Sequence, residues 1–549
     1  MSDTAAARKA RGAFFTPPEL CRFIADWAIR EATDVVLEPS CGDAEFLIAA
    51  HHRLAHLGGT TAGELRGAEL HAESAAAASV RLAPLGREVD IRVGDFFDAK
   101  PTGDAHAVIG NPPYVRYQAH GGTDRAASRA AALRAGVNLS GLASVWAAFT
   151  VHATQFLVTG GRAGLVLPAE LLSTNYAAPV RRFLMDSFSS VTLVMFHERV
   201  FPEVQEEVVL LLGDGFGLGP TDHCTLRQVA NVASLSEEAV HTTWTPPDPG
   251  GKWTASLLTE DALSVYTTVA GATGWSTLSA WGETSLGAVT GNNSFFTLTD
   301  DRVKSLGLGR DEVVRISPPG STHLRGLRLD VATLRDLDAG GRPTWLFRPG
   351  ANPSPAARRY IEAGEALQVQ DAYKCRVRTP WWQVPVLDPP DLFLTYMNAD
   401  SPRLCANTSG ARHLNSVHGL YASAGKRRLA RAVLPLASIN SMTLLAAETV
   451  GRAYGGGMLK IEPREADVLP VPGPELVQQC RPALDRLREH TGTSLRGDSL
   501  AATAAAVDEI LLVGELGLSA TQVKHLREQQ ATLMARRKSR SKRGTDGTR

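Results

Sequence analysis

Short apolar runs that alternate with helix-length segments constrain the first 225 residues more than any other feature of the sequence. A short apolar run bounded by turn residues indicates a buried strand, and a longer periodic connection indicates a helix. A chain that repeats this unit predicts an α/β fold, a doubly wound sheet with helices on both faces. The expected strands are residues 35–37, 65–70, 91–93, 107–109, 164–167, 191–196 and 208–212.

The first helix is expected to start near residue 16. Thr16 suits its N-cap, Pro17 suits its first turn, and Glu19 follows at the spacing of a capping box. Apolar residues then recur at steps of three and four, so one face of the helix should pack on the sheet. This stripe consists of Leu20, Phe23, Ile24, Trp27 and Ala28.

Two further regions follow along the chain. Residues 226–471 carry short β-like runs among Gly, Pro and Trp, which predicts a β-rich second domain. Residues 472–549 return to helical patterns, and Ser519 with Gln522 matches capping-box spacing. Six of the eight residues in 536–543 are Lys or Arg, which predicts a solvated basic tail, either disordered or in contact with phosphates.

Composition excludes several classes of protein. The 57 basic residues equal the 57 acidic ones, so no overall charge indicates a nucleic-acid partner. The six cysteines are scattered without a CxxC pair, which disfavours a structural zinc site and fits a reducing cytoplasm. No apolar run reaches the ~18 residues of a membrane span, so we expect no membrane contact.

The tetrapeptide Asn111-Pro112-Pro113-Tyr114 directly follows one expected strand. Ligands of open α/β sheets bind beyond the carboxyl ends of the strands. Two prolines remove backbone donors, so this loop should present acceptors, the Asn111 amide oxygen among them, to a substrate that offers N–H groups. Asn-Pro also starts ordinary turns, and a rigid turn with an Asn cap is the alternative.

Acidic residues follow the three preceding strands. Glu38 opens a loop of small residues after the first, where a ligand can approach the backbone. Glu69 ends the second, and a carboxylate there can accept from both hydroxyls of a ribose. Asp95 and Phe96 follow the third and suit an adenine, which offers an amino group and a flat ring. Each acid alone fits an exposed loop, but their shared position favours such a ligand.

Taken in order, the motifs TPPEL, LEPSCGDAEFL, GAEL, GDFFD, NPPYVRY and ERVFPEV resemble the adenine-N6 DNA methyltransferases of the gamma order, the TaqI-like enzymes of type II restriction–modification systems. The resemblance implies a Rossmann-like domain dependent on S-adenosylmethionine in residues 1–225, and a β-rich target-recognition domain in 226–471. Residues 472–549 would form a helical C-terminal segment. The implied reaction is methyl transfer to a flipped-out adenine, without a metal.

The resemblance also assigns residues. The Asn111 side-chain oxygen and the Pro112 carbonyl would each accept one hydrogen of the adenine amine. Tyr114 and Phe201 would enclose the flipped base. The implied cofactor contacts are Thr16, Glu38, Ser40, Cys41, Glu69, Asp95, Phe96, Asn111, Pro113 and Phe149.

Alternatives remain open for residues and for function. Thr16 could instead cap its helix, and Phe149 and Phe201 could be ordinary core residues. NPPY is shared with protein glutamine and RNA methyltransferases, and an inactive DNA-binding subunit is a further hypothesis. The sequence lacks a convincing PD-(D/E)xK set, so any cognate restriction endonuclease should be a separate chain. We expect a monomer that binds double-stranded DNA in the bacterial cytoplasm, at the nucleoid.

In the target-recognition domain, positive and aromatic side chains occur together, as phosphate contacts and base readout require. The glycines 455–457 permit a close approach to DNA or to another loop. A solvated face or a packing role is the alternative for each of these residues. The candidates are Arg376, Arg378, Trp381, Trp382, Lys426, Arg427, Arg428 and Arg431.

Overall fold

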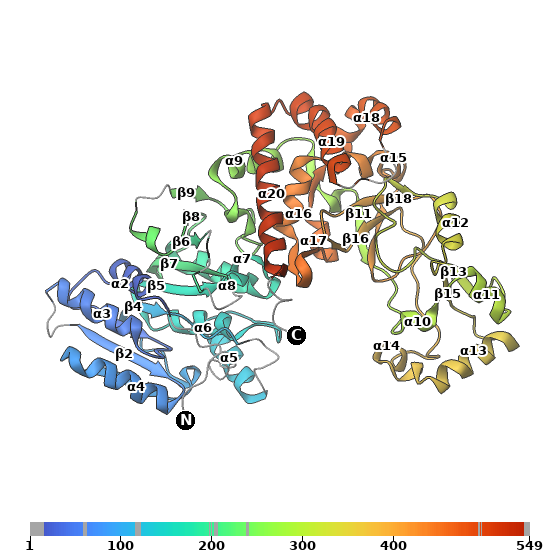
Figure 1. Cartoon of the computed structure of the whole chain (residues 1–549). Helices are drawn as coiled ribbons and strands as arrows, with labels where there is room; N and C mark the ends of the chain where they lie inside the picture. Colours follow the sequence, from blue (N-terminus) through green and yellow to red (C-terminus); the bar gives the residue numbers. More distant parts are fainter. Residues whose placement is uncertain are drawn as a thin grey trace. The chain divides into compact units, whose positions relative to one another are not determined.

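The chain folds into two compact units, residues 1–257 and 258–549 (Figure 1). The first unit extends past the expected boundary at residue 225, and the helices expected as a separate segment from 472 belong to the second unit. The computed structural model describes residues 16–58, 63–115, 122–196, 198, 200–201, 207–237, 241–491, 495 and 497–542.

A nine-stranded sheet forms the core of the first unit, in the order β3-β2-β1-β4-β5-β7-β6-β8-β9. The five strands β1 to β5 are parallel, whereas β7 lies antiparallel between β5 and β6. All seven expected strands are confirmed, and β8 and β9 extend the same sheet, which explains the longer unit. The strands are β1 Val35–Glu38, β2 Glu64–Glu69, β3 Val89–Val93, β4 Ala105–Gly110, β5 Leu157–Pro168, β6 Phe188–Phe196, β7 Val208–Phe216, β8 Cys224–Val229 and β9 His241–Trp244.

Two groups of helices pack on this sheet, α2 beside α3 and α6 beside α5 and α8. A Cβ atom at Gly164 of β5 would lie 2.6 Å from Cγ2 of Ile24, so glycine is what allows α2 to pack this closely. The predicted apolar stripe of α2 is confirmed, since its residues are buried or packed against the core. The helices are α2 Pro18–Ala28, α3 Glu45–His56, α4 Ala72–Leu82, α5 Gly122–Arg134, α6 Val145–Thr154, α7 Glu170–Ser173 and α8 Ala178–Ser187.

The predicted cap of α2 is wrong. The N-cap residue is Pro17, and no side chain caps the helix. The hydroxyl of Thr16 instead bonds to a distant residue, Asn111. The second predicted capping box is confirmed, because Ser519 Oγ accepts from the N–H of Gln522 and Gln522 Oε1 accepts from the N–H of Ser519.

The second unit is built from small sheets, the largest with the order β11-β19-β16-β18-β14. This confirms the expected β-rich character of the region after the first domain. Its strands are β10 Trp275–Thr277, β11 Gly282–Leu286, β12 Thr297–Leu298, β13 Val313–Arg315, β14 Arg328–Leu329, β15 Trp345–Phe347, β16 Leu392–Thr395, β17 Met397–Asn398, β18 Leu404–Asn407, β19 Val417–Ala422, β20 Arg452–Tyr454, β21 Met458–Lys460 and β22 Pro470–Pro472.

Twelve α-helices are described in this unit, five of them after residue 440. No single helix in the described part of the whole chain is long and apolar enough to cross a membrane. The helices are α9 Glu260–Ala270, α10 Asn293–Phe296, α11 Asp300–Leu306, α12 Val331–Ala339, α13 Pro355–Ala366, α14 Tyr373–Arg376, α15 Arg427–Ala437, α16 Ser441–Val450, α17 Pro463–Asp467, α18 Pro474–Glu489, α19 Gly497–Asp508 and α20 Ala520–Lys542.

Helix α20 packs along α9 and α16. Its Arg537 side chain is only 4% exposed and pairs with Glu448 of α16, with 2.8 Å between Nη2 and Oε1. The same guanidinium donates to the carbonyls of Asp400, at 3.0 Å, and of Gly457. The expected solvated tail is therefore wrong at Arg537, whose side chain is buried in a helix that continues to Lys542. Residues 543–549 lie outside the described residues.

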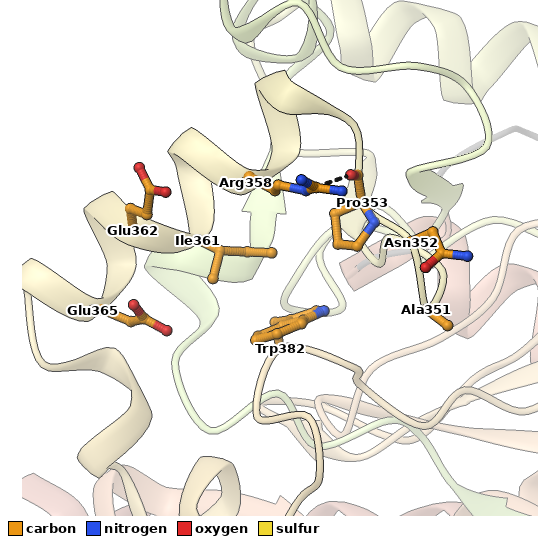
Figure 2. A pocket seen from close by; sticks show the side chains of 8 residues that line it. All are labelled: Ala351, Asn352, Pro353, Arg358, Ile361, Glu362, Glu365 and Trp382. Atoms are coloured by element: carbon orange, nitrogen blue, oxygen red, sulfur yellow. Dashed lines mark hydrogen bonds between the residues drawn. The ribbon is translucent and has the colours of Figure 1, made fainter.

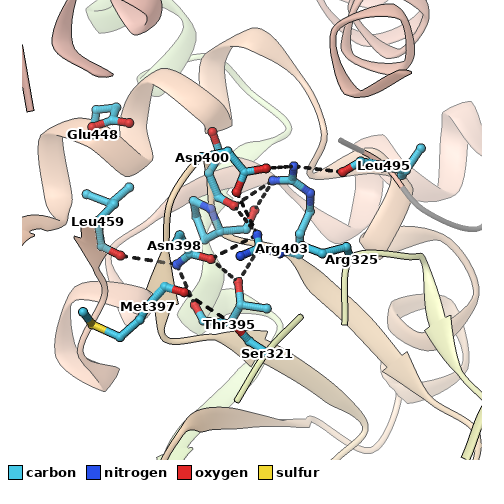
Figure 3. A network of polar contacts seen from close by, with 12 residues as sticks. Ser321, Arg325, Thr395, Met397, Asn398, Asp400, Arg403, Glu448, Leu459 and Leu495 are labelled. Atoms are coloured by element: carbon cyan, nitrogen blue, oxygen red, sulfur yellow. Dashed lines mark hydrogen bonds and ion pairs between the residues drawn. The ribbon is translucent and has the colours of Figure 1, made fainter. Parts of the chain in front are cut away.

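A polar network around Asp400 and Arg403 ties the C-terminal part to the β-rich part (Figure 3). The carboxylate of Asp400 bonds to Nη1 of Arg325 at 2.9 Å and to Nη2 of Arg403 at 3.0 Å. Arg403 also donates to the carbonyl of Leu495 at 3.3 Å. Because these charges are largely buried, each depends on the others, and the C-terminal helices fold together with the β-rich part as one unit.

The variant Arg537→Ala should lower the free energy of unfolding by about 3–5 kcal/mol, because it leaves the buried Glu448 carboxylate without its partner. Lys538→Ala, at the exposed next position, is the matched control and should change it by less than about 0.5 kcal/mol. Urea denaturation followed by circular dichroism measures both. Equal effects of the two variants would contradict the role given to Arg537.

Candidate active site

Asn111 stands directly after β4, where the backbone turns at Gly110. Gly110 has a φ of +154°, a conformation that favours glycine. The side-chain nitrogen of Asn111 donates to Oγ1 of Thr16 at 3.2 Å. Its side-chain oxygen is buried, and no group in the described part of the chain bonds to it. A buried acceptor left unpaired costs about 1–3 kcal/mol, so this oxygen is prepared for a ligand that donates.

Contacts from two further segments fix the tetrapeptide. Oγ of Ser40, in the loop after β1, donates to the backbone carbonyl of Asn111 at 3.2 Å. The hydroxyl of Tyr114 donates to the carbonyl of Val166 in β5 at 3.0 Å. Pro112 is buried and Pro113 is half-buried. The loop is therefore held at both ends before any ligand arrives.

Phe201 belongs to the same hydrophobic core as Tyr114 and is 5% exposed. The two aromatic residues predicted to enclose a base thus belong to one hydrophobic cluster. The low exposure of Phe201 also fits the alternative interpretation, in which it is an ordinary core residue. Residues 202–206, which follow it, lie outside the described residues.

The carboxylates after β1 and β2 hold backbone N–H groups of the neighbouring loops. Oε2 of Glu38 accepts from the N–H of Leu47 at 3.2 Å. Glu69 accepts from the N–H of Gly42 at 3.1 Å and from that of His71 at 2.9 Å, through different oxygens. Each carboxylate oxygen has a second lone pair, so Glu69 can still accept from a ligand. Cys41, also predicted as a contact, is buried and donates its N–H to the carbonyl of Ala68 at 2.9 Å.

Burial raises the pKa of the Glu38 carboxyl well above its ordinary value, and the charge of Asp43 raises it further. The pKa of Asp43 is also raised, chiefly by burial, while Arg81 opposes the rise. The end of β1 is thus an acidic site in which ionisation costs free energy. Such perturbed groups in a strand-end loop are typical of functional sites.

The residues after β3 meet helix α6 in an aromatic cluster. Oδ1 of Asp95 accepts from the N–H of Phe97 at 2.9 Å and so caps the short turn Phe96–Asp98. The ring of Phe96 lies 5.1 Å from that of Phe149 and 5.0 Å from that of His152. Phe96 and Phe149, predicted as cofactor contacts, are therefore brought together, 5% and 4% exposed.

The candidate DNA contacts of the second unit are mostly engaged within the protein. Trp381 donates to Glu365 at 3.1 Å, and Arg378 donates to the carbonyl of Val289. Three residues of the basic cluster also bond within the protein. Lys426 donates to the carbonyl of Ala280 at 2.5 Å, Arg427 donates to the carboxylate of Asp391, and Arg431 donates to the carbonyl of Asn407. The glycines 455–457 are approached by Arg537 of α20, through the carbonyl of Gly457. Arg376 and Arg428 are exposed.

Trp382 lines an open pocket of about 400 Å³ beside α13 (Figure 2). Its ring nitrogen is buried and has no partner among the described residues. Glu362 and Glu365 line the same pocket, and Arg358 is turned to the carbonyl of Pro353 at 3.0 Å. Two carboxylates disfavour a phosphate group there, so this pocket does not supply the expected contact to the DNA backbone.

Comparison with known proteins agrees with this arrangement. The profile of the N-6 DNA Methylase family matches residues 1–213, and that of the C-terminal domain of the type II methyltransferase M.Eco57I matches residues 250–512. This chain is a DNA methyltransferase, and the part of it that matches the N-6 methylase family is residues 1–213. The resemblance inferred from the motifs is confirmed.

Curated relatives span most of the chain. It is 24% identical over 484 residues to the type II methyltransferase M.XamI of Xanthomonas campestris pv. amaranthicola, which covers 84% of this chain and 85% of the relative. It is 20% identical over 381 residues to M.AccI of Acinetobacter calcoaceticus, covering 65% and 67%.

Among solved structures, the type IIL restriction–modification enzyme MmeI, solved in complex with DNA, has a TM-score of 0.54 at 11% identity, covering 92% of this chain and 73% of that one. At this identity the likeness concerns the fold alone. The expected methyltransferase fold is confirmed.

Glu38→Gln should stabilise the protein at neutral pH. The raised pKa means that the folded state binds a proton more tightly than the unfolded state, so the stability of the native protein falls as the pH rises above the ordinary value of 4.5. Gln cannot ionise, so the Tm difference between variant and native protein should be small near pH 4.5 and grow toward pH 8. Glu19→Gln, at an exposed position, is the control and should show no such growth. Thermal unfolding across this pH range measures both.

Proposed function

We propose that this chain is a site-specific adenine-N6 methyltransferase that uses S-adenosylmethionine and acts on double-stranded DNA as the modification enzyme of a type II restriction–modification system. The observation that carries the proposal is the buried side-chain oxygen of Asn111 at the end of β4, which has no partner among the residues that the structure describes. Together with the Pro112 carbonyl it offers two acceptors, which match the two hydrogens of an exocyclic amine.

These acceptors activate a poor nucleophile. The lone pair of the adenine amine is delocalised into the ring. When Asn111 and Pro112 each hold one hydrogen, the nitrogen becomes more tetrahedral and its lone pair localises. The amine can then attack a sulfonium methyl group in line: the N–C bond forms as the C–S bond breaks, the thioether leaves, and the methylated nitrogen releases one proton to solvent. The rate comes from positioning and from interactions that strengthen in the transition state.

Residues at the same sheet edge fit the cofactor. Gly42 and Gly94 face open space, since a Cβ atom at either would meet no atom within 4 Å. Glu69 and Asp95 border this space with lone pairs to spare, suited to ribose hydroxyls and an adenine amino group. When bound there, S-adenosylmethionine would supply a methyl group on a sulfonium centre. The other proposed contacts are those that the resemblance implies.

A base within a duplex cannot reach the Asn111 loop, so the target adenine must be flipped out, which costs a few kcal/mol of unstacking. Tyr114 is held at the loop by its bond to Val166, so its ring is preset to stack on the base. Stacking of this kind contributes about 1–3 kcal/mol. Phe201 is the proposed second wall.

Asn111→Ala should lower kcat on the order of 10²–10³-fold, the size of effect seen when one preorganised polar contact to a reacting centre is removed. The affinity for S-adenosylmethionine should fall much less than kcat, because Asn111 is one of several proposed contacts and those at β1, β2 and β3 remain. Transfer of labelled methyl groups to unmodified DNA gives kcat, and isothermal calorimetry gives the cofactor affinity. A variant that keeps full kcat would reject the mechanism.

Substrate class is tested separately. Purified enzyme is given labelled cofactor with duplex DNA, RNA and cell protein in parallel, and the methylated nucleoside is identified by mass spectrometry. N6-methyladenine in DNA is expected. Label in protein or RNA alone would favour those methyltransferase classes, and no label despite cofactor binding would favour an inactive DNA-binding subunit.

Helix α14 is the proposed contact of the second unit with the DNA backbone. Tyr373 and Val377 are 67% and 64% exposed, and Lys374 and Arg376 are exposed beside them. Exposed positive charges flanked by an aromatic side chain suit phosphate contacts made close to the bases.

The variants Lys374→Ala and Arg376→Ala should weaken DNA binding about equally for all sequences and reduce the slope of log affinity against log salt by about 1 each. Lys304→Ala is the control, because this lysine is 66% exposed but paired with Asp300 on its own helix. Fluorescence anisotropy at several salt concentrations measures the slope. An unchanged slope in both α14 variants would remove α14 from the interface.

A further inference from the structure

The hydroxyl of Thr16 reaches Asn111 from a segment 95 residues away in the sequence. Thr16 is 8% exposed and stands immediately before α2. The thiol of Cys21 donates to its carbonyl at 3.9 Å, and the N–H groups of Leu20 and Cys21 donate to Pro17 next to it. The position of the hydroxyl is thus fixed by the first turn of a buried helix.

The orientation of the Asn111 amide decides which chemistry the site can perform. The C=O and NH₂ ends of a carboxamide have nearly the same shape, and a half-turn about its last torsion exchanges them. With the oxygen toward the substrate, the amide accepts a hydrogen from an amine. With the nitrogen toward the substrate, the N–H donors of the amide face the N–H donors of the amine, and no hydrogen bond forms. The site therefore needs a group that distinguishes the two ends.

We propose that Thr16 is this positioning residue, an inference that rests on the proposed function. Oγ1 of Thr16 accepts from the Asn111 nitrogen, which turns the Asn111 oxygen to the side where none of the described residues bonds to it. Ser40 secures the same residue through its backbone carbonyl at 3.2 Å. Side chain and main chain of Asn111 are thereby held from two different segments.

The hydroxyl can do this while also serving a ligand. It has two lone pairs and one hydrogen, and the bond to Asn111 uses a lone pair. Within the described part of the chain, no acceptor takes its hydrogen. A cofactor contact of Thr16, as the resemblance implies, would use that hydrogen. The two roles involve different atoms of the same group, and they predict different kinetics.

Thr16→Val removes the hydroxyl with little change in shape. If Thr16 positions Asn111, kcat at saturating cofactor and DNA should fall on the order of 10-fold, the size of one hydrogen bond. Thr16→Ser should restore most of it. A residue that only binds cofactor would instead raise the KM for S-adenosylmethionine and leave kcat at saturation unchanged, which would overturn the inference.

A double-mutant cycle shows whether Thr16 acts through Asn111. In the Asn111→Ala background, Thr16→Val should have no further effect on the single-turnover rate, because the group that it orients is gone. Independent, multiplying effects would overturn the inference. Loss of rate in Asn111→Ala with none in Thr16→Val would reject only this inference, whereas full rate in Asn111→Ala would reject the proposed function itself.

Thr154→Val is the matched control for folding. Thr154 is fully buried in the same unit, and among the described residues its hydroxyl bonds only to the carbonyl of Val151 in its own helix, at 2.9 Å. The Thr154→Val variant should lose no more than a small part of kcat. The Tm of each variant is recorded, and a kcat loss in Thr154→Val equal to that in Thr16→Val would assign the effect to a general loss of packing.

Discussion

The candidate active site depends on the parallel arrangement of β1 to β4, which brings the carboxyl ends of these strands to one edge of the sheet. Loops that are far apart in the sequence therefore meet there. Glu69 after β2 reaches Gly42 after β1, and Asn111 after β4 reaches both Ser40 and Thr16. A suitable polar residue at the end of each strand is enough to build the site, because the pairing of the parallel strands brings these residues together.

This convergence also concentrates negative charge. Glu38, Asp43, Glu45 and Glu69 lie near one another, and burial together with neighbouring charge raises the pKa of Glu38. Arg81 of α4 pairs with two of these acids, Asp43 at 3.0 Å and Glu45 at 2.7 Å. Glu38 instead relies on a backbone N–H. Burying Glu38 among these acids therefore costs stability once its carboxyl ionises, a cost that is common at functional sites.

The sequence was informative where local pattern decides structure. Apolar runs predicted the seven strands that precede residue 217, and residue order after each strand predicted the candidate site. The pattern failed where a distant contact outcompetes a local one. Thr16 and Glu19 have the spacing of a capping box, but the hydroxyl bonds to Asn111 instead. Strands β8 and β9 were missed because their turn-rich surroundings resemble the β-rich region that follows.

The roles of the basic residues were also difficult to predict from the sequence, because they depend on distant contacts. Arg427, Arg431 and Arg537 were read as basic clusters, yet each donates to a carbonyl or carboxylate of its own unit. The charge of Arg537 is buried and not available to phosphates, whereas Arg427 and Arg431 remain exposed despite these bonds. An equal number of acidic and basic residues therefore says little about DNA binding, because the count does not separate engaged from exposed side chains. What matters is where exposed cations such as Lys374 and Arg376 stand, and only the folded chain reveals that.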